Sequence, residues 1–285
     1  MNYKKSYVPA IGYTKICEIG KCSLQQLEFG IIELKEGDSV TVETGEKEYG
    51  FLFLFGHADV VIEGKYDWKY VGGRTSVFGG QANTVYAGRH EKLTFTGCEH
   101  VKIAVCDTPI DVDTESQWLK PESVVYKTLG VKPWERVTSF NLDGTTNAKR
   151  LTVGEAWCTP GNWAGFPPHK HDEDNMPFEG VAEEIYYFLF QPEQGFAVQC
   201  MYKEGKFDEA YRVKQDDLVE FPEGYHTTVS APGYNTYFLW MMAGDHQGFY
   251  RSNDPQHDWV SAEEGVPEIP VSLERNTEVF RHPLL

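Results

Sequence analysis

Short runs of β-branched and aromatic residues, bounded by Gly, Pro, Asn or Asp, recur along the whole chain and predict β-strands. Segments with the 3.6-residue period of an amphipathic helix are scarce. Many short strands at regular spacing are typical of a β-sandwich or barrel, so we expect an all-β fold. The ten clearest runs are 39–44, 49–55, 59–64, 92–97, 101–107, 150–157, 183–190, 195–202, 217–224 and 237–244.

A weak internal repeat predicts two copies of one structural unit. Phe51-Leu52-Phe53 resembles Phe188-Leu189-Phe190 at an offset of 137, and residues 77–80 resemble residues 220–223 at an offset of 143, which would make Asn83 the counterpart of His226. We therefore expect a first barrel without metal ligands at 1–118, a connecting segment at 119–145, a second barrel that binds metal at 146–250 and a tail at 251–285.

The charge balance excludes one class of partner and disfavours another. Among 285 residues, 43 are Asp or Glu and 26 are Lys or Arg, for a formal net charge of −17. A protein that grips nucleic acid needs a basic face, and an anionic membrane surface repels an acidic chain. The longest apolar run, residues 51–55, is too short to span a bilayer. We expect neither nucleic acid nor membrane as a partner.

Six cysteines are scattered along the chain and form no Cys-x-x-Cys pair, as is typical of reduced thiols. The N-terminal residues lack the apolar core of a signal peptide. A cytoplasmic location is the interpretation that these two features favour. Exposed strand edges and the aromatic content would make a homodimer possible.

A histidine pair is the sharpest chemical feature. In a strand, residues i and i+2 point to the same face, so His169 and His171 would project two imidazoles together. Glu183 and Glu184 begin a later strand, and only one of them can face inward. His226 follows a Pro-containing turn. Three imidazoles and one carboxylate would form a good site for a first-row divalent ion. The remaining histidines lack such a partner: His57, His90, His100, His246, His257 and His282.

These residues lie within longer motifs that resemble the 5-deoxy-glucuronate isomerase family of bacterial myo-inositol catabolism, a duplicated cupin. Pro-Pro-His-Lys-His-Asp at 167–172 and Glu-Glu-Ile-Tyr-Tyr at 183–187 are the most specific. The resemblance is good from 150 to 259 and thinner in the first half. Its other motifs are residues 150–155, 162–163, 191–196, 222–226, 231–234, 242–244 and 253–259.

The resemblance implies two tandem cupin barrels (double-stranded β-helices). It also implies carbohydrate metabolism: ketol isomerisation of a small uronate, 5-deoxy-D-glucuronate, to 5-dehydro-2-deoxy-D-gluconate through a metal-stabilised ene-diolate. The family's metal ligands map onto His169, His171, Glu184 and His226. Zinc is the expected ion, and manganese or iron would also suit these donors.

An isomerase also needs a group that shuttles a proton. Glu183, Tyr186 and Tyr225 are the candidates taken from the motifs, with Glu155 as a fourth. Each has an ordinary alternative role, because tyrosines in strands commonly pack in cores and Glu155 could be a solvated strand residue. The sequence does not choose between them.

The substrate carboxylate needs a cation. Arg150 leads a motif strand and is the first candidate, with Asn162 as a further substrate-binding residue and Arg212 as a weaker option. Lys170 lies between the paired histidines, so alternation points it away from the metal. A cluster of acidic residues beside the ligands would favour a divalent cation: Asp172, Glu173, Asp174, Glu179, Glu183 and Glu184.

Two other functions use the same fold. An iron-dependent cupin dioxygenase could hold iron with the same four ligands, and a non-catalytic sugar-binding cupin could bind a uronate without turnover. Fold alone does not decide among cupins. The ranking that places the isomerase first therefore depends on the longer motifs.

Overall fold

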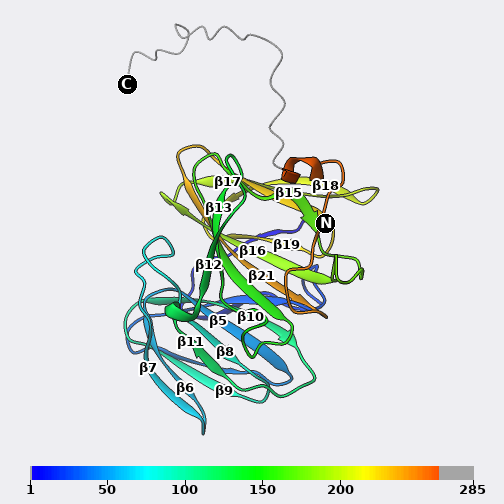
Figure 1. Ribbon diagram of the computed structural model, residues 1–285. Coiled ribbons are helices and arrows are strands. Elements are labelled where there is room, and N and C mark those ends of the chain that lie inside the picture. The colour runs from blue at the N-terminus through cyan, green and yellow to red at the C-terminus, as the bar shows by residue number, and fades with distance from the viewer. Residues whose placement is uncertain (1, 263–285) are drawn as a thin grey trace, which may run out of the picture.

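The computed structural model describes residues 2–262, and these residues are almost entirely β (Figure 1). Each of the ten predicted runs overlaps a strand, which confirms the all-β prediction. Two 3-10 turns, Pro121–Ser123 and Asp258–Ala262, are the helical elements of this part of the chain. Residues 263–285, which include His282 and most of the expected tail, lie outside the described residues.

The strands form two barrels, each made of two sheets. The first barrel contains β2 (Gly12–Cys17), β3 (Glu28–Leu34), β4 (Ser39–Glu43), β5 (Lys47–Phe55), β6 (His57–Ile62), β7 (Tyr66–Gly72), β8 (Thr84–Ala87), β9 (Lys92–Gly97), β10 (Val101–Pro109) and β11 (Gln117–Leu119). Its sheets have the orders β11-β8-β5-β10-β3-β2 and β4-β9-β6-β7.

The second barrel contains β1 (Lys4–Ser6), β12 (Val125–Leu129), β13 (Arg136–Phe140), β14 (Leu151–Cys158), β15 (Trp163–Lys170), β16 (Ala182–Gln191), β17 (Phe196–Lys203), β18 (Phe207–Lys214), β19 (Asp217–Phe221), β20 (Tyr225–Ser230), β21 (Asn235–Gly244) and β22 (Ser252–Asn253). Its sheets have the orders β1-β19-β16-β21-β14-β13-β12 and β18-β17-β20-β15-β22. The strand order of the first barrel is thus repeated in the second.

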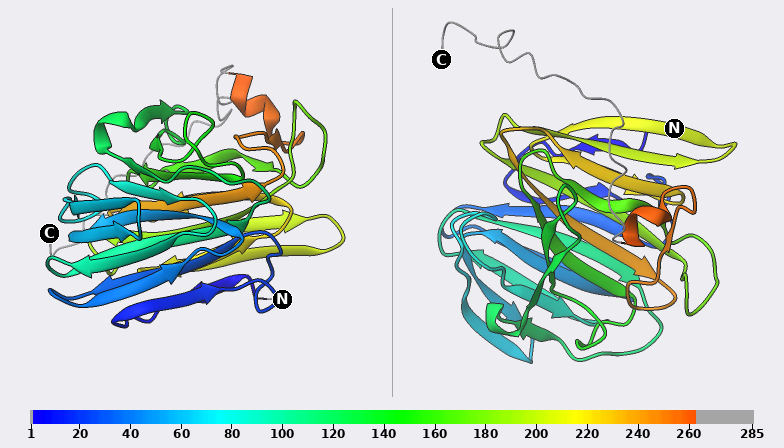
Figure 2. Two further views of the ribbon diagram at one scale, coloured as in Figure 1. Left: turned by 90° about the horizontal axis from the view of Figure 1, so that it is seen from below. Right: turned by 45° about the horizontal axis from the view of Figure 1, so that its top comes forward.

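The two larger sheets pack against each other and bury an apolar layer between the barrels (Figure 2). This layer combines Phe29 and Leu52 of the first barrel with Tyr187 and Leu239 of the second. Each barrel encloses a further apolar cluster of its own. Because successive strand residues point to opposite faces, strands such as β5 and β16 are buried on both sides and appear in the sequence as continuous apolar runs.

The segments that precede and follow the first barrel in the sequence both add strands to the second barrel. β1 pairs with β19, so the first residues of the chain extend a sheet of the second barrel. The segment 119–145, expected as a connection, contributes β12 and β13 to the same sheet. β12 is mostly exposed, and β13 buries polar residues such as Arg136 and Thr138, so neither short strand has an apolar run by which to predict it. β22, from the expected tail, pairs with β15.

A buried ion pair also links the barrels. Arg74, in the loop after β7, lies 2.6 Å from a carboxylate oxygen of Glu155 on β14, and the Tyr237 hydroxyl donates a hydrogen bond of 2.8 Å to the same carboxylate. Arg74 and Glu155 are both almost fully buried. This pairing explains Glu155 as a structural residue and removes it from the candidates for the catalytic base.

Within residues 2–262, no helix combines the length and apolar character needed to cross a membrane. All six cysteines are free thiols.

Candidate metal centre

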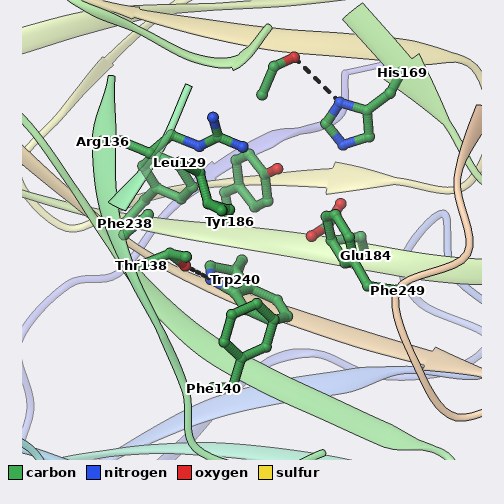
Figure 3. Close-up of a pocket in the computed structure, with 12 residues that line it drawn as sticks. Leu129, Arg136, Thr138, Phe140, His169, Glu184, Tyr186, Phe238, Trp240 and Phe249 are labelled. Carbon is green, nitrogen blue, oxygen red and sulfur yellow. Dashed lines mark hydrogen bonds between the residues drawn. The ribbon is translucent and has the colours of Figure 1, made fainter. Parts of the chain in front are cut away.

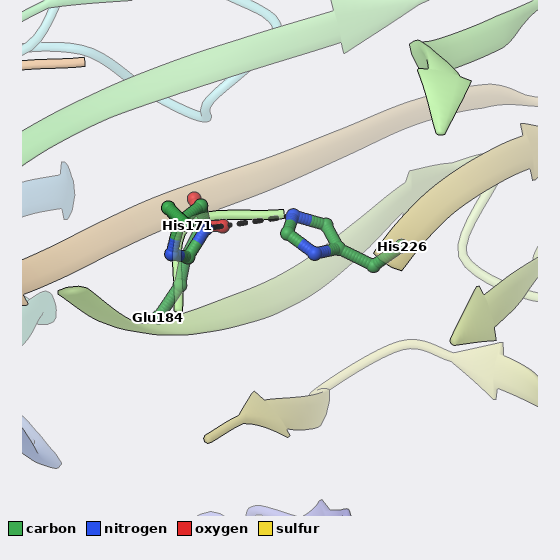
Figure 4. Close-up of side chains that lie close together, drawn as sticks. All are labelled: His171, Glu184 and His226. Atoms are coloured by element: carbon green, nitrogen blue, oxygen red, sulfur yellow. Dashed lines mark hydrogen bonds and ion pairs between the residues drawn. The ribbon is translucent and has the colours of Figure 1, made fainter. Parts of the chain in front are cut away.

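Three strands of the second barrel bring the predicted ligands together. β15 carries His169 and ends just before His171, β16 carries Glu184, and β20 carries His226. The Nε2 atoms of His171 and His226 lie 3.0 and 3.1 Å from Oε2 of Glu184 (Figure 4). One donor atom from each of these three residues lies within 4.8 Å of the others, and all three are buried. This distance is compatible with ligation of one ion.

His169 lies beside this cluster. It pairs in register with His226 across β15 and β20, and the centroids of the two rings are 4.4 Å apart. Its Nδ1 donates a hydrogen bond of 3.1 Å to the carbonyl of Gly165. Its Nε2 is buried without a hydrogen-bond partner. His169 is not among the three residues whose donor atoms meet within 4.8 Å, so its ligation stays a prediction.

The protein backbone orients the imidazoles. Nδ1 of His171 donates a hydrogen bond of 2.7 Å to the carbonyl of Ala182, which leaves its Nε2 facing Glu184. Metal-binding histidines are commonly fixed in this way through the nitrogen that does not ligate. Oε1 of Glu184, like Nε2 of His169, is buried without a hydrogen-bond partner. Buried nitrogen and oxygen atoms that lack hydrogen-bond partners and lie beside one another are suited to binding a divalent transition-metal ion.

The electrostatics of the cluster also fit a cation. Burial opposes ionisation of Glu184, but the hydrogen bond with His171 and the close contact with His226 outweigh it and lower the pKa of the carboxyl. Burial would lower the pKa of His171, but its contact with Glu184 raises it. Burial lowers the pKa of His226 and lowers that of His169 well below its ordinary value. The site therefore contains the ionised carboxylate of Glu184 beside the imidazoles of His169 and His226, which favour the neutral form that binds metal.

A pocket opens beside the ligands inside the second barrel (Figure 3). His169 and Glu184 lie on one side of it, and Arg136 on β13 lies on the other. Trp240 and Phe249 are among its apolar walls. The space free of protein atoms is about 390 Å³, its opening to solvent included.

Tyr186 is the sequence-predicted catalytic residue that lines this pocket. Its hydroxyl has no hydrogen-bond partner among the described residues, and its ring centroid is 5.8 Å from that of His226. Burial and then the charge of Glu184 raise the pKa of Tyr186 well above its ordinary value. The hydroxyl is therefore protonated at neutral pH and suited to donating a hydrogen bond.

The structure does not place Glu183 in the pocket. Alternation along β16 turns it to the face opposite Glu184, where its carboxylate accepts hydrogen bonds from the backbone amides of Gln25, Gln26 and Leu27. This carboxylate holds the segment before β3 against the second barrel. Its position corrects the expectation that Glu183 is a candidate base.

Replacing Glu183 with glutamine is expected to lower the free energy of unfolding by about 1 to 3 kcal/mol, because three backbone amides lose a charged acceptor. Urea unfolding measures this change. Glu193→Gln, at an exposed position, is the matched control and should change stability by less than about 0.5 kcal/mol. Equal stability of the Glu183 variant and the wild type would contradict the structural role.

Tyr225 and Asn162 also lie away from the pocket lining. The Tyr225 ring packs on Tyr202 with centroids 5.5 Å apart and faces a different, open surface groove. The Asn162 side chain donates a hydrogen bond of 3.0 Å to the carbonyl of Glu135. Both residues belong to the long motifs, but motif membership does not specify which way a side chain points.

Arg150 is occupied elsewhere. Its guanidinium donates to the carbonyls of Gly244 and Pro109 and to Gln26, and it pairs with Asp245 at 2.9 Å. These partners come from both barrels, so Arg150 links the barrels and does not line the pocket. It therefore does not offer a free cation to a substrate carboxylate.

The acidic residues around the ligands are mostly neutralised. Lys170 points away from the ligands, as alternation predicts, and lies 2.9 Å from Asp172, 3.0 Å from Glu173 and 2.9 Å from Glu179. Asp172 also pairs with Lys203 at 2.7 Å. Of the six acidic residues expected to attract a cation, Glu184 is the one whose carboxylate meets the histidines.

Two arginines were missed by the sequence analysis. Arg136 lines the pocket, and Arg251 precedes β22 close enough to His169 and Tyr186 to influence both electrostatically. Neither lies in a charged motif, and they are 115 positions apart in the chain. Only folding brings them to one place.

The first barrel lacks the ligand set. Its β6–β7 hairpin and the β17–β18 hairpin turn on the same Glu-Gly-Lys tripeptide, at 63–65 and 204–206, which fixes the correspondence of their strands. Following the pairing onto β9 and β20 makes Phe95 the counterpart of His226. The offset of 143, which gave Asn83, was therefore wrong.

The other ligands also have non-ligating counterparts. Val40 pairs with Phe95 in the first barrel as His169 pairs with His226 in the second. The offset of 137 between β5 and β16 makes Lys47 the counterpart of Glu184. The residues that correspond to His169, His171 and Glu184 are Val40, Val42 and Lys47. Apolar side chains and an amine in these positions do not form a site for a cation.

Comparison with known proteins finds a family whose match covers strands of both barrels. Residues 10–260 match the KduI/IolB family. A 5-deoxy-glucuronate isomerase of Geobacillus kaustophilus is 34% identical over 81% of this chain and 84% of its own length. One of Shouchella clausii is 31% identical over 85% of this chain and 90% of its own length.

Solved structures agree on the architecture. An IolB-like protein of Salmonella typhimurium superimposes with a TM-score of 0.87 at 27% identity, covering 92% of this chain and 100% of that one. Oxalate decarboxylase of Bacillus subtilis superimposes with a TM-score of 0.62 at 12% identity, covering 88% and 79%. The second likeness concerns the fold alone, and it confirms the expected pair of cupin barrels.

Proposed function

The chain belongs to the KduI/IolB family, and on this basis we propose that it is an aldose–ketose isomerase that converts 5-deoxy-D-glucuronate to 5-dehydro-2-deoxy-D-gluconate. The observation that carries the proposal is the buried cluster of His171, Glu184 and His226 at the wall of a pocket. The curated relatives that carry the isomerase name align over more than four fifths of the chain.

His169, His171, Glu184 and His226 are proposed to hold a divalent ion, with zinc as the expected metal. Their buried donors without partners support this assignment. When bound, such an ion supplies Lewis-acid stabilisation of the charge that develops on the substrate oxygens in an ene-diolate. The backbone bonds of His169 and His171 keep the donor nitrogens in place before substrate binds.

Tyr186 is proposed to donate and recover a proton at a substrate oxygen. Its hydroxyl lies in the pocket and carries its proton at neutral pH. The apolar walls formed by Trp240 and Phe238 limit the water around the reacting carbons. Exclusion of water strengthens every hydrogen bond that forms inside the pocket.

Replacing Tyr186 with phenylalanine is expected to lower kcat by about 10²- to 10⁴-fold, the range for removal of a proton-transfer group. Folding is expected to be retained, because the hydroxyl has no hydrogen-bond partner among residues 2–262 to lose. Steady-state kinetics of both Tyr186→Phe and Tyr225→Phe would distinguish the two tyrosine candidates, since Tyr225 lies outside the pocket. A larger loss in the Tyr225 variant would contradict the assignment.

The proposed function is tested by proton NMR of 5-deoxy-D-glucuronate incubated with metal-loaded protein. The expected result is loss of the aldose signals and growth of those of the keto product. Oxygen consumption with the same compound would indicate a dioxygenase in place of an isomerase. Binding without turnover would indicate a sugar-binding protein.

A further inference from the structure

Two guanidinium groups converge on the proposed substrate pocket. Arg136 lines the pocket and is 8% exposed. Arg251 lies over the ring of Phe249, 5.2 Å from its centroid, and Phe249 lines the same pocket. Nη1 of Arg251 is buried without a hydrogen-bond partner. The two arginines are close enough that the charge of Arg136 acts on Arg251.

Neither guanidinium is neutralised by the described part of the chain. Among residues 2–262, Arg74, Arg89 and Arg150 each pair with a carboxylate. Arg136 and Arg251 do not, and neither side chain donates a hydrogen bond within that range. Burial lowers the pKa of Arg136, and burial followed by repulsion from Arg136 lowers that of Arg251 to about 10.

Two neighbouring cations, one buried and one half-buried, are costly when no carboxylate pairs with them directly, because charges leave water without gaining a close partner. Proteins keep such groups where a ligand supplies the missing charge. The planar guanidinium offers paired N–H donors that match the two oxygens of a carboxylate. The pocket thus has a metal-ligand side at Glu184 and His169 and a cationic side at Arg136 (Figure 3). Arg251 adjoins the pocket through its contact with Phe249.

We propose that Arg136 and Arg251 bind the carboxylate of the uronate substrate and select acids over neutral sugars. This inference rests on the proposed function for the identity of the substrate. A uronate carries its carbonyl and its carboxylate at opposite ends of one carbon chain. Binding the carboxylate at the arginines places the carbonyl end toward Glu184 and Tyr186, where the reaction takes place.

The test compares the binding of D-glucuronate with that of its neutral analogue, D-glucuronamide, by calorimetry on metal-loaded protein. Wild-type protein is expected to prefer the carboxylate. Arg136→Met and Arg251→Met are each expected to lose about 30-fold or more in affinity for glucuronate and little for glucuronamide. Arg212→Met removes an exposed arginine of β18 and is the matched control, with the preference retained.

A second measurement distinguishes substrate binding from a structural role. Because each arginine repels the other in the free protein, either methionine variant is expected to raise the melting temperature without ligand, by about 2 °C or more. An arginine needed for folding would show a fall. Glucuronate would raise the melting temperature of wild-type protein more than that of either variant.

The outcomes separate this inference from the proposed function. If wild-type protein prefers glucuronate and the variants do not, the carboxylate site stands even when 5-deoxy-glucuronate is not isomerised. If glucuronate and glucuronamide bind equally to wild-type protein, or if both methionine variants keep the preference, the proposal is overturned, whatever the isomerase assay shows. A fall in the melting temperature of both variants would also count against it.

Discussion

Isomerase activity is expected to fall by about 10³-fold or more when His226 is replaced with leucine, together with loss of the bound metal. His226 is fully buried, and its Nε2 lies 3.1 Å from Glu184. Leucine has similar size and no donor atom, so the change removes a ligand without opening a large cavity. A loss of several kcal/mol in transition-state stabilisation corresponds to this fall in rate.

Metal content by elemental analysis and turnover by NMR measure the two effects in the same samples. His257→Leu is the control, because His257 is exposed in the described part of the chain and lies outside the pocket. Circular dichroism checks that both variants are folded. Retention of metal and activity in the His226 variant, alongside a functional control, would refute the ligand assignment.

The largest expected effect on stability comes from the ion pair that joins the barrels. Arg74→Met leaves the buried Glu155 carboxylate without its cation, and we expect a loss of about 3 to 5 kcal/mol in the free energy of unfolding. The double variant Arg74→Met/Glu155→Leu removes both charges. It is expected to regain part of the loss, because neither charge is then buried alone.

Urea unfolding followed by tryptophan fluorescence measures these changes. Lys206→Met breaks an exposed pair with Glu223 of the same 2.6 Å length, and should cost less than about 1 kcal/mol. The contrast between the two pairs isolates the effect of burial. If Arg74→Met costs no more than Lys206→Met, the buried pair does not stabilise the contact between the barrels.

The metal cluster could be predicted because it depends on local pattern. Alternation along one strand brings the imidazoles of His169 and His171 to one side and sends Lys170 to the other, and Glu184 is separated from Glu183 by the same rule. A carboxylate that binds backbone amides and one that meets histidines look alike in sequence. Only the face of β16 distinguishes them.

The cationic side of the pocket could not be predicted. Arg136 and Arg251 lie outside the motifs and meet through the pairing of β13 with β14 and of β22 with β15. Arg150 was preferred because it begins a motif, but a motif does not show whether a side chain is already occupied. Its hydrogen bonds to Gly244 and Pro109 depend on how the barrels pack.

Strands that are buried on both faces could be predicted from their apolar runs, as for β5, β10, β16 and β21. Short or half-exposed strands such as β1 and β12 gave no such signal. The repeat was aligned correctly along β5 and β16, where no insertion intervenes. It was misaligned beyond them because the loops between later strands differ in length between the barrels.

Titration of metal-stripped protein with a divalent ion, with isomerisation of 5-deoxy-D-glucuronate followed by NMR, tests the central claim most directly. The second barrel carries the cluster of His171, Glu184 and His226, whereas Phe95 stands at the corresponding position of the first. Activity is therefore expected to be absent without metal and to saturate at about one ion per chain. Full activity in the metal-free protein, or saturation only at two ions per chain, would contradict the account.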